Sequence, residues 1–143
     1  MSTAKRTVVS ACLAGVPCRY DGNCTEHPAV MELVRAGLAL PVCPEQVGGL
    51  PTPRTPAEIV DGRVMTKDGQ DVTGEYEQGA RECLRLAKLA GCTRAVLQPR
   101  SPSCGAGTVY DGTFSGTLIP GFGRFAALCR DNGLELVNPD DLD

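Results

Sequence analysis

Residues 7–12 read TVVSAC, a short run rich in β-branched side chains that is typical of a buried strand and ends at a cysteine. Residues 38–43 (LALPVC) repeat this arrangement, and residues 94–98 (RAVLQ) predict a third strand, which Cys104 follows in the next loop. In an open α/β sheet, the loops beyond the carboxyl ends of the strands converge on one crevice, where ligands bind. The sequence therefore predicts that three cysteines, far apart along the chain, meet at one edge of a sheet.

Helical patterns alternate with strand patterns along the rest of the chain. This alternation predicts a mainly parallel sheet with helices on both faces. No linker or internal repeat divides residues 1–143, so we expect one α/β domain of the Rossmann-like class. The predicted elements are helices over His27–Arg35, Gly74–Ala90 (capped by Thr73) and Phe122–Asn132, hairpins over Glu58–Thr66 and Thr108–Phe114, an irregular loop over Pro44–Pro56, and a last strand over Leu134–Val137.

The charge balance favours a small-molecule partner. The chain has 14 basic and 17 acidic residues, a net charge of −3, which provides no electrostatic footprint for a nucleic-acid backbone or an anionic membrane. No apolar run is long enough to span a bilayer. We therefore expect a cytoplasmic protein with neither a nucleic-acid nor a membrane partner, whereas the oligomeric state is not predictable from the sequence.

Five of the eight cysteines are separated from the strand-end set by their positions. Cys83 and Cys129 lie on apolar faces of predicted helices, where we expect small buried side chains. Cys92 precedes a strand, and therefore lies at the opposite edge of the sheet. Cys18 and Cys24 share the first loop and can approach a metal there, although their spacing matches no common ligand motif.

The remaining cysteines, Cys12, Cys43 and Cys104, are candidate metal ligands. Soft thiolates select zinc, copper(I) or iron–sulfur clusters. Structural zinc sites usually draw ligands as close Cys-x2-4-Cys pairs, which this chain lacks, and ligands scattered over three loops better suit a bulkier iron–sulfur centre. A centre with three protein ligands also keeps one position open for chemistry.

Polar side chains accompany the cysteines in the same loops. Glu45 follows Cys43 by two residues, where it can transfer a proton or remain a solvated loop carboxylate. Ser101 and Ser103 can hydrogen-bond a ligand or satisfy a turn. An arginine in such a loop can fix an anionic or carbonyl group or serve as a surface charge. One arginine lies in each of the three loops: Arg19, Arg54 and Arg100.

As a set, these motifs resemble the thiouracil desulfidase family, and the similarity covers nearly the whole chain. The motifs are Ser10–Gly15 with Arg19–Gly22, then Cys43–Glu45 with Gly48–Leu50 and Pro53-Arg54, then Ser101–Gly105 with Tyr110–Phe114. The resemblance implies a cytosolic bacterial enzyme with an oxygen-sensitive 4Fe–4S cluster whose fourth iron is free. The implied reaction converts 2- or 4-thiouracil and water to uracil and hydrogen sulfide, by non-redox Lewis-acid catalysis at the open iron.

The resemblance also implies roles for individual residues. Cys12, Cys43 and Cys104 match the cluster ligands, Glu45 the catalytic acid/base, and Ser101 a catalytic or substrate-positioning residue. Three further polar loop residues are expected to bind the substrate, a small thiolated pyrimidine: Ser103, Arg19 and Arg54.

Other functions remain open at this point. A non-catalytic iron–sulfur or zinc-binding module for electron transfer or sensing would be favoured if Cys18 or Cys24 were a fourth ligand. A thiol-dependent enzyme would use Cys12 or Cys43 as its nucleophile. A role as a sulfur carrier or in tRNA thiolation is weaker, because the chain lacks a basic nucleic-acid surface.

Overall fold

A four-stranded parallel sheet lies at the centre of the computed structural model, which describes residues 5–142. The strand order is β2-β1-β5-β8, comprising β2 (Ala39–Val42), β1 (Thr7–Ser10), β5 (Arg94–Val96) and β8 (Glu135–Val137). All three pairings are parallel, which confirms the predicted α/β class. The chain leaves β1 toward β2 and later returns to the other side of β1, so the order reverses between β1 and β5. Ligands bind at such reversals.

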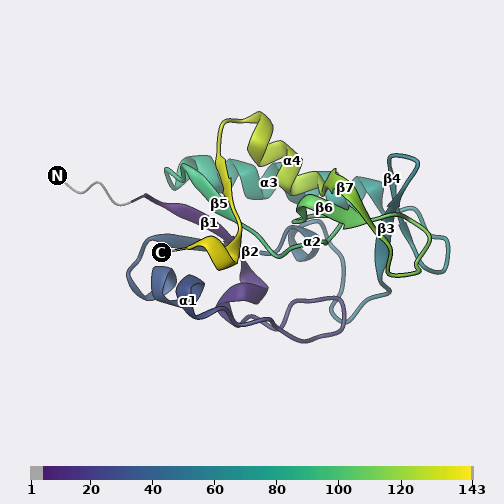
Figure 1. Cartoon of the computed structure of the whole chain (residues 1–143), viewed down its shortest axis with the longest axis horizontal. Coiled ribbons are helices and arrows are strands. Elements are labelled where there is room, and N and C mark those ends of the chain that lie inside the picture. The colour runs from purple at the N-terminus through teal and green to yellow at the C-terminus, as the bar shows by residue number, and fades with distance from the viewer. Residues whose placement is uncertain (1–4, 143) are drawn as a thin grey trace.

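Helices cover both faces of the sheet, as predicted (Figure 1). Val8 and Val9 are neighbours in β1 and point to opposite faces. Val9 packs with Val30 of α1 (Pro28–Arg35). Val8 belongs to the core formed with α3 (Thr73–Leu89) and α4 (Arg124–Asp131). The strand that precedes the first cysteine is therefore anchored from both sides.

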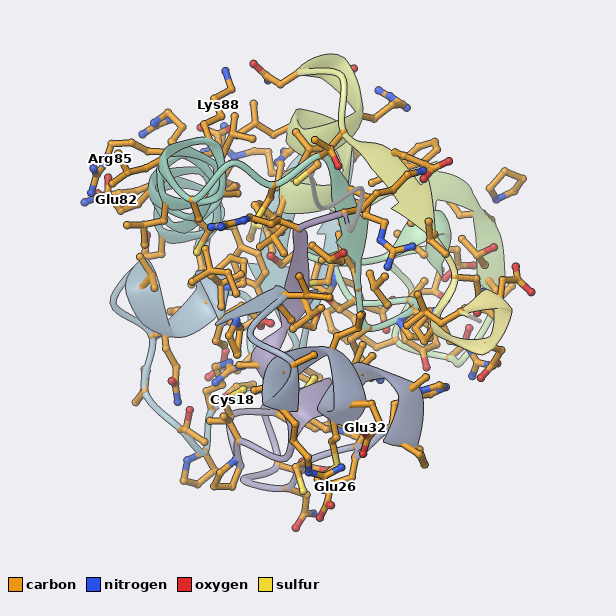
Figure 2. All side chains as sticks on the ribbon, turned by 90° about the vertical axis from the view of Figure 1, so that its left-hand side faces the viewer. Cys18, Glu26, Glu32, Glu82, Arg85 and Lys88 are labelled. Carbon is orange, nitrogen blue, oxygen red and sulfur yellow. The ribbon has the colours of Figure 1, made fainter. Side chains whose placement is uncertain are left out.

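Helix α3 agrees closely with the predicted 74–90 helix but begins differently. Thr73 is not its cap: the Thr73 hydroxyl oxygen accepts the Val64 backbone N–H at 2.8 Å, while the Asp71 carboxylate accepts the Thr73 N–H at 2.9 Å. The outer face carries Glu82, Arg85 and Lys88, which point to solvent (Figure 2). The predicted apolar stripe is buried in full: Tyr76, Ala80, Cys83, Leu84 and Ala87.

The packing cysteines behave as expected. Cys83 and Cys129 are fully buried in the core between α3, α4 and the sheet. Cys92 is buried in the same core, close to the amino end of β5. Cys83 and Cys129 are thus core side chains, and Cys92 lies at the amino edge of the sheet, as predicted.

The predicted irregular loop over residues 44–56 is wrong at its start, because α2 (Pro44–Val47) forms there. Four residues are too few to show a helical period, so packing decides the structure of this segment. A Cβ on Gly79 of α3 would lie 1.8 Å from the Pro44 carbonyl oxygen, and one on Gly48 would lie 2.0 Å from the Glu75 carbonyl oxygen. Two glycines therefore let α2 rest directly on the backbone of α3.

Two hairpins lie together beyond the sheet (Figure 1). The first, β3 (Ala57–Val60) and β4 (Arg63–Thr66), turns at Asp61-Gly62 as predicted, with φ values of 49° and 78°. Both residues thus adopt the left-handed conformation that a type I′ turn requires.

The second hairpin, β6 (Ala106–Tyr110) and β7 (Leu118–Phe122), is longer than the predicted 108–114 segment. Gly107 in β6 and Pro120-Gly121 in β7 hide the strand pattern. Because β7 takes Phe122, the last long helix begins at Arg124 and not at residue 122.

Two short 3₁₀ segments complete the chain, η1 (Ala11–Ala14) and η2 (Pro139–Asp141). Among residues 5–142, the structure contains no helix of the length and apolarity that a membrane crossing needs.

Candidate active site

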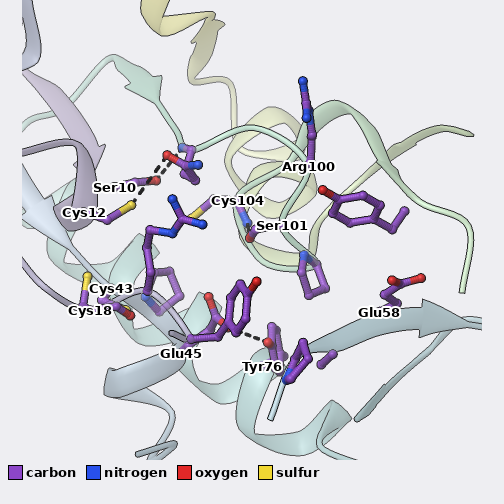
Figure 3. A pocket seen from close by; sticks show the side chains of 18 of the residues that line it. Ser10, Cys12, Cys18, Cys43, Glu45, Glu58, Tyr76, Arg100, Ser101 and Cys104 are labelled. Carbon is purple, nitrogen blue, oxygen red and sulfur yellow. Dashed lines mark hydrogen bonds between the residues drawn. The ribbon is translucent and has the colours of Figure 1, made fainter. Parts of the chain in front are cut away.

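A cavity of about 520 Å³ opens at the carboxyl ends of β1, β2 and β5. Cys12, Cys43 and Cys104 all line it, so the structure brings the three strand-end cysteines together (Figure 3). Cys18, from the first loop, lines the same cavity. The two hairpins supply the side away from the cysteines, which includes Glu58 (Figure 3).

Cys12 is fixed by the 3₁₀ turn η1, which starts where β1 ends. Gly15 closes this turn with φ 98°, a left-handed conformation that favours glycine. The Cys12 Sγ lies 3.7 Å from the Gln98 side-chain oxygen, and the Gln98 N–H donates to the Ser10 hydroxyl at 2.8 Å. The ends of β1 and β5 are thereby linked at the first cysteine.

Cys43 stands at the amino end of α2, immediately before Pro44 at the first helical position. Its Sγ lies 3.9 Å from the backbone carbonyl of Cys18. Since α2 rests on the glycine contact with α3, the position of this thiol depends on that contact.

Cys104 is held by Ser101 and by the start of α4. The Ser101 hydroxyl oxygen accepts the backbone N–H groups of Ser103 at 3.0 Å and Cys104 at 2.7 Å. The N–H groups of Arg124 and Phe125 donate to the carbonyls of residues 102 and 103, both at 2.8 Å. The first turn of a helix thus fastens the loop that presents the third cysteine.

The surroundings of Cys18, Cys43 and Cys104 favour the protonated form of each thiol. Hydrogen bonding with Cys18 and burial raise the pKa of the Cys43 thiol, and burial raises that of Cys104. Hydrogen bonding with Cys12 raises the pKa of the Cys18 thiol to about 11, although its contact with Cys43 acts in the opposite direction. Metal ligation by these thiols must therefore release protons.

The donor set fits a multinuclear centre better than a single ion. Within the part of the chain that the structure describes, no three His, Cys, Asp or Glu side chains lie close enough to hold one metal ion. The thiols line a shared cavity from three separate loops, and all are soft sulfur donors. A shared cavity lined by three thiols suits an iron–sulfur cluster.

Glu45, the second residue of α2, is oriented by two donors. The Tyr76 hydroxyl donates to Glu45 Oε1 at 2.5 Å, and Arg54 Nε lies 3.3 Å from the same oxygen. Burial and the Glu45 carboxylate raise the pKa of Tyr76, so Tyr76 stays a hydrogen-bond donor. Burial alone lowers the pKa of Arg54, but the same carboxylate and the neighbouring groups raise it overall.

The other predicted site residues divide into two groups. Ser101 and Arg19 line the cavity, and Arg19 also donates to the Thr25 hydroxyl at 2.8 Å. Ser103 and Arg54 are absent from the lining: Ser103 is fully buried, and Arg54 lies against Glu45 with 6% of its side chain exposed. Their expected contact with substrate stays a prediction, and their placement favours support of the loops.

Two residues of the site escaped sequence reasoning. Tyr76 fits the apolar stripe of its helix, and only the rule that a buried tyrosine hydroxyl needs a partner signals another role. Glu58, in a hairpin strand, accepts the N–H groups of Gly112 at 2.9 Å and Phe114 at 3.2 Å, and so holds the loop after β6 against the cavity. No local sequence pattern predicts this long-range contact.

Comparison with known proteins agrees with this geometry over almost the full chain. The profile of the 2-thiouracil desulfurase family matches residues 7–141. The protein YbbK of Bacillus subtilis (strain 168) is 39% identical over an alignment of 145 residues, gaps included, that covers 94% of this chain and 96% of YbbK. The solved structure of the [4Fe-4S]-dependent thiouracil desulfidase TudS is 43% identical, with a TM-score of 0.92, and the match covers 96% of this chain and 93% of that one.

Proposed function

The chain belongs to the 2-thiouracil desulfurase family, and we propose that it is a [4Fe-4S]-dependent desulfidase that converts 2- or 4-thiouracil and water to uracil and hydrogen sulfide. The observation that carries the proposal is the convergence of three thiols and one oriented carboxylate on a single cavity. The reaction exchanges sulfur for oxygen without net electron transfer, so neither an oxidant nor a reductant is needed.

Cys12, Cys43 and Cys104 would hold the cluster. They end or follow three parallel strands, and each is fixed by its own turn, helix or hydrogen-bonded loop. When bound, a cluster with three protein ligands supplies an iron that acts as a Lewis acid toward a thiocarbonyl sulfur. The protein supplies the proton transfers and the orientation of the ring.

Glu45 acts as the acid/base. Its carboxylate lines the cavity, and only 16% of its side chain is exposed. Water that attacks the ring carbon loses both of its protons as it becomes the carbonyl oxygen, and the departing sulfur gains two protons as it leaves as hydrogen sulfide. A single carboxylate can accept each proton from the water in turn and deliver it to the sulfur.

Ser101 acts on both the loop and the substrate. Its oxygen already accepts two backbone N–H groups, so its own O–H remains available to donate to a ring carbonyl. Arg19 lines the cavity and would contact the substrate there, whereas Ser103 and Arg54 would act from behind the lining.

The thiols and the net charge of the chain bear on its cellular location and on the class of its substrate. None of the eight cysteines is paired, which suits a reducing cytoplasm. The net charge of −3 favours a free thiolated pyrimidine over a nucleic acid as the substrate.

Anaerobic reconstitution with iron and sulfide, followed by 4-thiouracil, tests the function. We expect cluster absorbance together with uracil and sulfide in equal amounts. Cys43→Ala should lose the cluster and the activity together. The matched control is Cys83→Ala, which removes a core thiol and should keep both. Iron incorporation by the wild-type protein without either product would eliminate the desulfidase proposal.

Glu45→Gln tests the acid/base role separately from cluster binding. The amide keeps the shape of the side chain but cannot accept a proton, so turnover should fall by roughly 100-fold or more while the cluster absorbance stays. A fully active Glu45→Gln enzyme would show that another group moves the proton.

One observation favours a second function, a four-cysteine electron-transfer or sensor module. Cys18 lies in the same cavity, with its carbonyl beside the Cys43 thiol. Cys18→Ser separates the two functions. A desulfidase should keep its cluster and its turnover in this variant, whereas loss of the cluster would indicate a fourth ligand and support the module.

A further inference from the structure

Glu45 is bound through one of its two oxygens. Tyr76 and Arg54 both donate to Oε1, at 2.5 Å and 3.3 Å. Among residues 5–142, no side chain or backbone group donates to Oε2. The two donors therefore make the carboxylate asymmetric: one oxygen is engaged by the protein, and the other is free on a side chain that lines the cavity.

Tyr76 cannot follow Glu45 if the carboxylate moves. The tyrosine is 2% exposed and packs with Val64 and Val72 under the first hairpin. It lies one turn before Gly79, where α2 rests on α3 without an intervening side chain. The hydroxyl and the residue it binds are thus carried by two backbones in direct contact.

Arg54 is equally constrained, because its guanidinium has three further acceptors. Nη2 donates to the Cys18 carbonyl at 2.9 Å, and Nη1 donates to the Thr52 hydroxyl at 2.9 Å and the Pro51 carbonyl at 3.2 Å. A guanidinium held in this way has little rotational freedom left. It also ties the first cysteine loop to the helix that carries Glu45.

We propose that Tyr76 and Arg54 are positioning residues that hold Glu45 Oε1, so that Oε2 is the oxygen that exchanges the proton with water and the departing sulfur. This inference rests on the proposed function, and it assigns the reaction to one atom of the carboxylate. Arg54 is absent from the cavity lining and Tyr76 lines it beside Glu45, and both act through the carboxylate. Their effect is to keep Oε2 in one orientation, and an ångström-scale displacement of a reacting group costs roughly 100-fold in rate.

Tyr76→Phe removes only the donor hydroxyl and is the direct test. We expect kcat to fall by roughly 10- to 100-fold while KM for 4-thiouracil changes by less than about threefold. The cluster absorbance should match that of the wild type. The control is Thr7→Val, which removes a buried hydroxyl bound to Arg94 at 2.7 Å, at the opposite edge of the sheet. It should leave kcat and KM unchanged.

Arg54→Lys is the second variant, since it keeps the charge but loses the planar fork. It should also lower kcat. The double variant with Tyr76→Phe should lose no more kcat than the more damaging single variant, because both residues act on one atom. If Glu45→Gln is inactive but Tyr76→Phe retains full kcat, the positioning inference fails alone. If Glu45→Gln is fully active, the acid/base role fails with it.

Discussion

The Ser101 hydroxyl holds the loop of the third cysteine, in addition to the substrate contact that we propose for it. Its oxygen accepts the backbone N–H groups of Ser103 and of Cys104, the third cysteine. The loop is closed further by the Gly105 N–H, which donates to the Ser101 carbonyl at 2.9 Å. The position of Cys104 therefore depends on both the side chain and the backbone of residue 101.

Ser101→Ala should lower both stability and cluster loading. Removing the acceptor leaves two backbone N–H groups of the loop without their partner, at a cost of about 1 kcal/mol, as for a lost helix cap. Thermal unfolding and the absorbance per protein after reconstitution measure the two effects. Thr93→Ala, an exposed hydroxyl before β5, is the control. A Ser101→Ala protein with full cluster loading and lost turnover would restrict the serine to a catalytic role.

At the residue scale, the sequence predicts cysteines better than it predicts their partners. Each strand-end cysteine follows a recognisable apolar run, so their convergence in one cavity was predictable. Ser103 and Arg54 share the same loops but are absent from the cavity lining, because loop membership does not determine side-chain direction; their contact with substrate stays a prediction. Tyr76 was hidden by the apolar period of its helix.

Among the elements, the contact between α2 and α3 matters most for the site. Helix α2 has only four residues, yet it begins with the ligand candidate Cys43 as its cap and carries Glu45. Gly48 and Gly79 bring its backbone against that of α3. A helix that is too short to be stable alone is thus held in place by close backbone contact with α3, which the two glycines permit because they have no side chain.

Gly79→Ala should destabilise the protein, contrary to the preference of helices for alanine. The new Cβ would meet the Pro44 carbonyl at 1.8 Å, so α2 must move, at a cost of about 1–3 kcal/mol. Gly74→Ala, in the same helix with open space around its Cβ, should instead gain about 0.5–1 kcal/mol. Urea unfolding measures both. Equal stabilisation by the two variants would contradict the close contact.

Element prediction succeeded where patterns are long and failed where packing decides. The 17 residues of α3 carry charges that suit both ends of the helix and a full apolar stripe, and its range was predicted to within one residue at each end. The four residues of α2 carry no such signal. The second hairpin was underestimated because Gly107, Pro120 and Gly121 lie inside its strands.

On the scale of the whole molecule, the cavity lies between the sheet edge and the two hairpins. The sheet supplies the thiols, whereas the hairpins supply Glu58, Tyr110 and Phe114 on the lining. Glu58 joins the two hairpins, because its side chain extends from β3 and accepts two N–H groups from the loop after β6. The fold class was predictable from the sequence, but the position of the loop after β6 against the cavity depends on one long-range contact of Glu58.

Glu58→Ala should weaken substrate binding more than turnover. Without the carboxylate, the Gly112 and Phe114 N–H groups lose their acceptor, and the loop no longer holds its place against the cavity. We expect KM for 4-thiouracil to rise on the order of tenfold, about 1.4 kcal/mol, with normal cluster absorbance. Glu82→Ala, an exposed ion-pair partner on the outer face of α3, should change neither constant. A fall in kcat alone would place Glu58 in the chemistry.

The fastening of the third cysteine loop by α4 has a consequence for biosynthesis. Cys12 emerges from the ribosome early, but the loop of Cys104 is not held until Phe125 has been made, 113 residues later (125 − 12). At about 5–20 residues per second, the first thiol waits roughly 6 to 23 seconds for its companions. With the ligand set proposed above, the complete cluster site forms only after translation has passed α4.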